Sequence, residues 1–130
     1  MDIPKDVKLY EHLIATLWFD EDSILHSVSK TSPRTMEVMA DYADFLKKLT
    51  DNKKVLILTD ITKASPLDKK TREFIEPHLK ESFTAMAILS NAPMSDMIAN
   101  VFIASNKPNF PTRMFLNEKD GKDWLMSFMG

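Results

Sequence analysis

Short apolar runs that alternate with helical patterns constrain this chain more than any other feature of its sequence. The run "VLILTDI" (55–61) is unbroken, too short for a globular helix, and bounded by lysines on one side and polar residues on the other. Such a run is typical of a strand that is buried on both faces of a parallel sheet. A second run, "TAMAIL" (84–89), has the same character. We therefore predict two buried parallel strands joined through a helical segment.

The remaining strands are predicted nearer the two ends of the chain. "HLIATLWF" (12–19) and "SILHSV" (23–28) are β-prone and are separated by the acidic "DED", which favours a hairpin. "RMFL" (113–116) predicts a fifth strand. The alternation predicts an α/β sandwich in the order ββαβαβαβα, with a mixed, mostly parallel five-stranded sheet, about four helices and an antiparallel hairpin edge. We expect one domain that spans residues 1–130.

Helix boundaries are predicted from capping residues and prolines. Ser32 is expected to cap the first helix, with Pro33 at its first position. The apolar residues of that helix recur at helical spacing, and they are Met36, Met39, Tyr42, Ala43, Phe45, Leu46 and Leu49. Pro77 is expected to break the second helix, because proline lacks an N–H and its ring clashes with the preceding turn. A third helix is predicted at 93–106, and Asn117 is expected to cap the closing helix.

The composition excludes several classes of function. The 17 basic and 19 acidic residues give a formal net charge of −2, so the chain has no electrostatic footprint for nucleic acid. Cysteine is absent, which excludes a disulfide scaffold, thiolate metal sites and a cysteine nucleophile. The two glycines, Gly121 and Gly130, cannot build a P-loop or a dinucleotide-binding turn, and no cofactor is expected.

The chain is expected to be a cytoplasmic protein without stable membrane insertion. Its start, "MDIPKDVKLYEH", is too charged for a signal peptide. No apolar run approaches the roughly 18 residues that a membrane-spanning helix needs. The lack of cysteine agrees with a reducing compartment.

The stretch "AILSNAPMSDMIANVFIASNKPNFPTRMF" (87–115) and the pair Trp124 and Leu125 carry a family resemblance. Together with the order of elements, they make the chain from Ser23 to Leu125 resemble the STAS-type, SpoIIAA-like fold family, and an uncharacterised bacterial branch of it most of all. The family includes bacterial anti-sigma-factor antagonists and the cytoplasmic domains of anion transporters. The resemblance implies a SpoIIAA-like sandwich and a non-enzymatic regulatory domain that binds a protein partner.

Members of the family that this chain resembles have a phosphorylation switch, and the resemblance implies that this chain lacks its serines. Antagonists of the family carry an Asp-Ser-Ser-Gly motif at the start of the helix after the third strand, and its second serine is phosphorylated. The matching positions here are Asp68, Lys69, Lys70 and Thr71, so only the aspartate is retained. The resemblance therefore implies a regulatory domain without the usual phosphoserine switch.

Polar side chains gather where two predicted strands feed the helices that follow them. Ligands of parallel sheets bind outside the carboxyl ends of the strands, and a helix N-terminus offers free N–H groups to an anion. A site for an anion or a partner is therefore predicted at Asp60, Thr62, Ser65, Asp68, Lys69, Lys70, Ser90 and Asn91. The alternative is ordinary structure, in which Asp68 caps a helix, the lysines are solvated and Asn91 belongs to a turn.

Phe110 lies in the proline-containing segment "NKPNFPT" (106–112). Each X-Pro bond restricts the residue before it to extended conformations, so the segment predicts a rigid connector into the last strand. Phe110 is alternatively predicted as an exposed anchor for a protein partner, since aromatic residues are enriched at the centres of interfaces.

The sequence offers no catalytic constellation. His12, His26 and His78 have no metal-ligand spacing, and no serine has the glycines of a nucleophile elbow. The chain is therefore predicted not to be an enzyme. A carrier domain for a small molecule or a lipid is the alternative to partner binding, because the nine methionines provide adaptable apolar surface for a small apolar ligand.

A homodimer is predicted from the first two strands. They carry Leu13, Leu17, Trp18 and Phe19, an unusually apolar set for a hairpin at the edge of a sheet. Open sheet edges are usually covered or paired, so we expect a second copy to bury part of this hairpin or its neighbouring helices.

The lysines at the motif positions predict that no phosphate is added there by a serine kinase of the anti-sigma-factor type. Lys70 occupies the place of the phosphorylated serine, and lysine cannot accept phosphate in serine-kinase chemistry. Incubation with such a kinase, followed by mass spectrometry, is expected to show no stoichiometric phosphate between residues 60 and 71. Full phosphorylation of Ser65 or Thr71 would show that the switch has moved along the chain.

Overall fold

A six-stranded mixed sheet lies at the centre of the computed structural model, which describes residues 1–90 and 110–129. The strands are β1 (Tyr10–Glu11), β2 (Ala15–Phe19), β3 (Leu25–Ser29), β4 (Val55–Asp60), β5 (Phe83–Leu89) and β6 (Thr112–Phe115). Their order in space is their order in the chain. β1, β2 and β3 pair antiparallel, whereas β3, β4, β5 and β6 pair parallel. The predicted α/β class with an antiparallel edge is confirmed.

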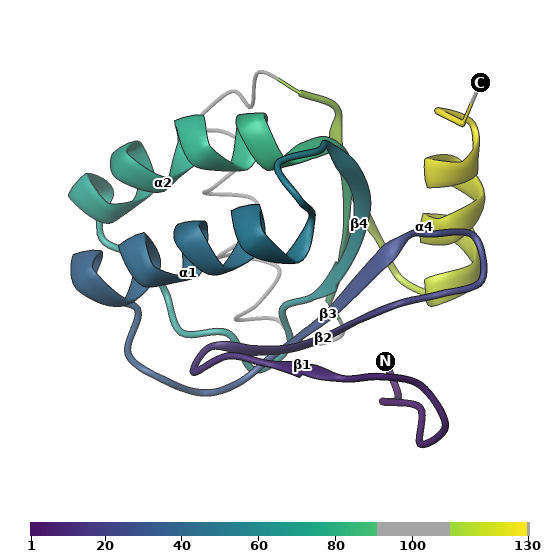
Figure 1. The fold of residues 1–130 in the computed structure, drawn as a ribbon, viewed down its shortest axis with the longest axis horizontal. Coiled ribbons are helices and arrows are strands. Elements are labelled where there is room, and N and C mark those ends of the chain that lie inside the picture. Colours follow the sequence, from purple (N-terminus) through teal and green to yellow (C-terminus); the bar gives the residue numbers. More distant parts are fainter. Residues whose placement is uncertain (91–109, 130) are drawn as a thin grey trace.

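Helices cover both faces of this sheet (Figure 1). In the described part of the chain they are α1 (Met36–Leu49), α2 (Lys69–Ser82) and α4 (Glu118–Met126). α1 and α2 lie side by side on one face, and α4 packs on the other face against β4 and β5. The helix predicted at 93–106 lies outside the described residues.

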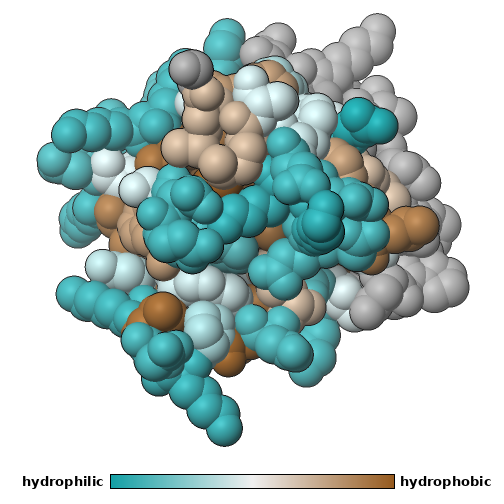
Figure 2. Space-filling view, turned by 90° about the vertical axis from the view of Figure 1, so that its right-hand side faces the viewer, coloured by the Kyte–Doolittle hydropathy of each residue, from teal (hydrophilic) through white to brown (hydrophobic). Residues whose placement is uncertain are grey.

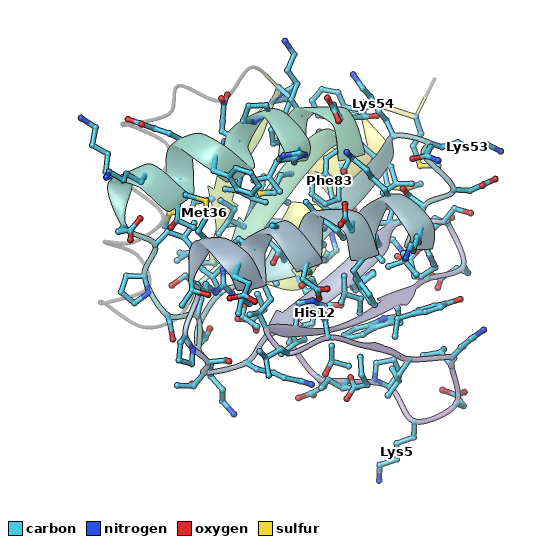
Figure 3. The ribbon with its side chains drawn as sticks, turned by 60° about the vertical axis from the view of Figure 1, so that its left-hand side comes forward. Lys5, His12, Met36, Lys53, Lys54 and Phe83 are labelled. Atoms are coloured by element: carbon cyan, nitrogen blue, oxygen red, sulfur yellow. The ribbon has the colours of Figure 1, made fainter. Side chains whose placement is uncertain are left out.

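The alternation of side chains along each strand divides the buried residues between two cores. In β4, Ile57 faces α1 and α2, whereas Leu58 faces α4; in β5, Ile88 and Leu89 are divided in the same way. The larger core lies beneath α1 and α2, and Figure 3 looks onto these helices with Phe83 labelled between them. β4 and β5 are therefore buried on both sides, which explains why their sequences are nearly continuous apolar runs.

The smaller core depends on a close approach of α4 to the sheet at Gly121. A Cβ atom at this buried position would lie 2.9 Å from Leu58 Cδ1, 3.5 Å from Ala87 Cβ and 3.6 Å from Leu89 Cδ2. The missing side chain lets the helix axis come near the strands, and the fully buried Leu125, one turn later, fills the remaining space.

Helix caps were predicted with mixed success. α1 begins at Met36 and its N-cap is Thr35, whose hydroxyl accepts a backbone N–H at 3.2 Å, so the prediction of Ser32 as the cap and Pro33 as the first helical residue is wrong. Serine is the somewhat better N-cap of the two, so local preference favoured Ser32 over Thr35. The Asn117 cap of α4 is confirmed, since its Oδ1 accepts the N–H three residues later at 2.9 Å.

The edge of the sheet differs from the prediction of five strands. β1 was missed because two residues are too few to show an alternating pattern, yet it pairs with β2 and covers that edge. Leu17 and Trp18 are only 0% and 4% exposed, so they do not form the exposed apolar surface from which the homodimer was predicted, although Leu13 is 60% exposed. The homodimer itself stays a prediction.

Pro77 lies inside a continuous α2, so the predicted break of this helix is wrong. Pro77 is exposed, while Ile75 and Leu79 on either side of it are buried in the core under α1 and α2. Burial of this apolar face stabilises the helix enough to offset the hydrogen bond and the steric room that proline removes, a local cost of about 3 kcal/mol.

Replacing Pro77 with alanine is expected to stabilise the protein. Alanine restores the missing backbone donor within α2, and this gain exceeds the loss of the restraint that proline places on the unfolded chain. The free energy of unfolding, measured by urea denaturation, should rise by about 1–2 kcal/mol. Lys80→Ala, at another exposed position of α2, is the control and should change it by less than about 0.5 kcal/mol. A destabilised Pro77→Ala variant would contradict this account.

Candidate functional site

Three of the predicted site residues meet at the carboxyl ends of β4 and β5. Asp60, Thr62 and Ser90 line a small pocket of about 130 Å³. Asp60 is buried, its Oδ1 accepts the N–H of Thr62 at 2.9 Å, and its Oδ2 accepts from the Met1 amino group at 2.5 Å. Burial alone would raise the pKa of Asp60, but these hydrogen bonds outweigh it and lower the pKa below its ordinary value. The pocket thus holds a carboxylate whose charge is already compensated.

The other predicted residues lie apart from this pocket. Ser65 lines a second cavity, on the face of the sheet that carries α1 and α2. Asp68 is the N-cap of α2, where its Oδ1 accepts the N–H of Thr71 at 2.8 Å, and this bond lowers the pKa of Asp68. Lys69 and Lys70 are exposed in the first turn of α2. The single predicted crevice is therefore wrong: the structure divides its residues between the two faces of the sheet.

The alternation of side chains along β4 explains this division. Consecutive side chains of a strand point to opposite faces, and Asp60 follows Leu58 towards α4, while Thr59 and Ile61 point towards α1 and α2. The chain then turns on the α1 and α2 side to reach Ser65. Residues that are close in the sequence are thereby separated by the thickness of the sheet.

Two further predictions have different outcomes. Phe110 is only 8% exposed and belongs to the core under α1 and α2, so the alternative of an exposed partner anchor is wrong. An aromatic ring beside prolines gains more from burial in this core than from exposure to water. Asn91 lies outside the described residues.

The cavity between α1, α2 and the sheet is the more distinctive site. It has a volume of about 120 Å³. Most of its wall is apolar and comes from strands, helices and the loop after β4, through Ile14, Ala15, Met39, Ile57, Ile61, Ala64, Leu67, Ile75, Leu79, Phe83, Met86 and Ile88. Half-buried residues such as Ile61, Ser65 and Leu67 also line it, so it is a partly open pocket that reaches into the core.

A polar group of side chains forms one part of the cavity wall. It comprises Arg34, Tyr42, Ser27 and Ser29, from the segment before α1, from α1 and from β3. The Nη2 of Arg34 donates to Ser29 Oγ at 3.1 Å, whereas its Nε is buried without a hydrogen-bond partner in the described structure. We call these four residues the polar wall.

Burial changes the protonation behaviour of the polar wall. Desolvation lowers the pKa of Arg34, although a guanidinium keeps its charge at any physiological pH. Desolvation also raises the pKa of the Tyr42 hydroxyl, and the nearby Arg34 charge and a hydrogen bond with Ser27 offset this only in part. The polar wall therefore presents one positive charge and neutral hydroxyl groups.

The polar wall was not predicted from the sequence, although part of the signal was present. Ser27 and Ser29 alternate with His26 and Val28 in β3, so both serines share the face of Leu25, which is fully buried. Two hydroxyls on the core face of a strand indicate a polar feature inside the protein. The position of Arg34 had no comparable signal, since it depends on where α1 begins.

A cluster of charged groups lies on the opposite face, around the β2–β3 turn. His26 is buried, its Nε2 lies 2.7 Å from Asp20 Oδ2, and its ring stacks on Trp18 at a centroid distance of 5.2 Å. Lys122 of α4 reaches the same Asp20 Oδ2 at 3.2 Å. This cluster fastens α4 to the hairpin, and its groups are paired with one another.

Metal and membrane sites are not found in the described structure. In residues 1–90 and 110–129, no group of three or more histidine and acidic side chains is arranged to hold a metal ion. Across the same ranges, no helix combines the length and the apolar character that crossing a membrane requires.

Comparison with solved structures identifies the class of fold. The chain is similar to the crystal structure of an uncharacterised protein of the DUF3478 family, with a SpoIIAA-like fold, from Shewanella loihica PV-4. The two share 17% sequence identity and a TM-score of 0.61, and the match covers 96% of this chain and 99% of that chain. The chain therefore has a SpoIIAA-like fold, which confirms the resemblance drawn from its sequence.

Within this class the chain belongs to a family defined by its sequence. The model of the family described as "Domain of unknown function (DUF7793)" matches residues 17–129, so the chain is a member of that family. The matched range contains the whole polar wall. No curated protein matches the chain.

The Asp20 cluster predicts a specific loss of stability in acid. Burial alone would raise the pKa of Asp20, but hydrogen bonds to His26, to the N–H groups of Ile24 and Asp22 and to Lys122 lower it. A carboxylate with a lowered folded-state pKa stabilises the protein above its unfolded value of 3.8, and this stabilisation is lost as the pH falls through the folded value.

Asp20→Asn should therefore lower the free energy of unfolding by about 1–2 kcal/mol at pH 6, and this difference from wild type should shrink below about pH 4. Urea denaturation across this pH range measures both effects. Asp44→Asn, a change of an exposed residue in α1, is the control and should follow wild type. A difference for Asp20→Asn that stays constant down to pH 2.5 would show that the charge of Asp20 is not involved.

Proposed function

We propose that this chain is a non-enzymatic binding domain that holds a small, largely apolar molecule in the cavity between α1, α2 and the sheet. The cavity of about 120 Å³ is the observation that carries the proposal. The apolar wall of an empty pocket lacks packing partners on one side, and an occupant that makes contacts with the wall would gain this packing and bury apolar surface. The volume favours a small molecule over a lipid.

The chemistry of the wall supports binding rather than catalysis. Among the described residues, no carboxylate, imidazole or thiol lines the cavity. The titratable groups of this described wall are Arg34 and Tyr42, and burial raises the pKa of Tyr42, which makes this hydroxyl a poor general base. Such a wall can recognise and retain a molecule, but its described residues include no base that would activate a serine hydroxyl as a nucleophile.

Protein-partner binding without a phosphoserine switch is the second candidate. It is favoured by apolar side chains at the end of α4, where Met126, Phe128 and Met129 are 36–45% exposed. Figure 2 looks onto the side of the molecule that carries α4, where hydrophilic residues dominate and apolar ones form separate small patches. The outer face of α2 carries an exposed pair of Lys69 and Glu73 at 4.0 Å, which contributes little energy.

A neutral probe tests whether the cavity accepts a ligand. Pentanamide, which has a four-carbon apolar body, should shift the NMR methyl signals of Met39, Ile57 and Ile75 in the cavity wall, with a dissociation constant in the roughly millimolar range. Ala64→Leu enlarges a side chain of the wall and should weaken this binding at least about fivefold by filling the space. The control is Ala40→Leu, a partly exposed position of α1 outside the wall.

Two outcomes would contradict the proposal. One is the absence of any saturable shift of the wall methyl groups at high probe concentration. The other is equal binding by the Ala64→Leu and Ala40→Leu variants, since this would place the probe outside the cavity.

A further inference from the structure

Arg34 is the one charged residue in the described wall of the cavity, and its charge is not matched there. Its Nη2 donates to a neutral acceptor, Ser29 Oγ, at 3.1 Å, and its Nε is buried without a hydrogen-bond partner. No carboxylate in the described part of the chain forms an ion pair with it. Arg34 is half-buried, and charges that are partly withdrawn from water are normally paired, yet none of the described residues supplies an anion to it.

Arg72 shows that a buried Nε alone is not a binding site. Its Nε is also buried without a partner in the described structure, while its Nη1 donates to the carbonyl oxygen of Leu67 at 3.0 Å. Arg72 does not line the cavity, whereas Arg34 does. The distinguishing observation is the combination of an unmatched guanidinium with an adjacent volume that a ligand can enter.

The hydroxyl groups beside Arg34 favour a carboxylate as the anion. The hydroxyls of Tyr42, Ser27 and Ser29 belong to the same wall. Tyr42 and Ser27 share a hydrogen bond, which uses the proton of one of them, so the other hydroxyl of this pair and that of Ser29 can donate to a carboxylate. These three residues are 8%, 2% and 4% exposed, so their hydroxyls have little access to bulk water. A single guanidinium compensates a single negative charge, which favours a monoanion over a doubly charged phosphate.

We propose that the cavity binds a small monocarboxylate, with its carboxylate against Arg34 and the hydroxyls of the polar wall and its apolar body between Met39, Ile57 and Ile75. This inference rests on the proposed function and names its class of ligand. The apolar body is limited by the volume: a cavity of about 150 Å³ accommodates benzene, so about 120 Å³ accommodates four or five carbon atoms.

The test compares pentanoate with pentanamide, which has the same size and shape but no charge. Both are titrated into the wild-type protein and followed through the methyl signals of Met39, Ile57 and Ile75. Pentanoate should bind about tenfold more tightly, because a charge-assisted hydrogen bond to the half-buried guanidinium of Arg34 is worth about that factor. Arg34→Gln should remove this preference, so that the variant binds pentanoate no more tightly than pentanamide. Arg72→Gln is the matched control and should keep the preference.

The outcomes separate the two proposals. Equal binding of the two probes by wild type, or a preference for pentanoate that Arg34→Gln retains, overturns the carboxylate inference and leaves the binding cavity standing. Failure of both probes overturns both. Because the comparison of probes uses the wild-type protein, a loss of folding in Arg34→Gln, checked by thermal unfolding, does not prevent a decision.

Discussion

The burial of β4 and β5 on both faces is the constraint on which the rest of the structure depends. Each apolar residue of these strands belongs either to the core under α1 and α2 or to the core under α4, and neighbours such as Ile57 and Leu58 belong to different cores. Two apolar layers are therefore formed by one pair of strands. Both faces of β4 and β5 must be covered by helices. This explains the close approach of α4 at Gly121, and it explains why α2 stays helical through Pro77.

The same constraint decides where polar groups are tolerated. On the α4 side, Asp20 and Asp60 are buried with partners that compensate their charge. On the other side, Arg34 enters the wall of a cavity without an anionic partner in the described structure. Arg34 is thus a half-buried charge whose counterpart is not supplied by the described residues, and it borders a volume of about 120 Å³. The proposed binding role rests on this combination and not on the helix N-terminus of α2.

Sequence analysis predicted those features that depend on local patterns. The apolar runs at 55–61 and 84–89 predicted β4 and β5, and Asn117 was correctly predicted as the N-cap of α4. Features that depend on tertiary contacts were missed, as the unbroken helix at Pro77 shows. For the site, Asp60 and Ser90 were placed correctly at one edge, but Ser65 lies on the opposite face. The cavity requires the relative position of α1, α2 and the sheet, which no local pattern contains.

Intermolecular nuclear Overhauser effects between pentanoate and the methyl groups of the protein test the central claim most directly. They report in solution which side chains touch the bound molecule, without any variant. The account predicts effects from Ile57 and Ile75 to the end of the apolar chain, with none from Leu58 and Leu89 on the α4 side. Effects confined to the α4 side, or to exposed methyl groups such as that of Met129, would contradict it.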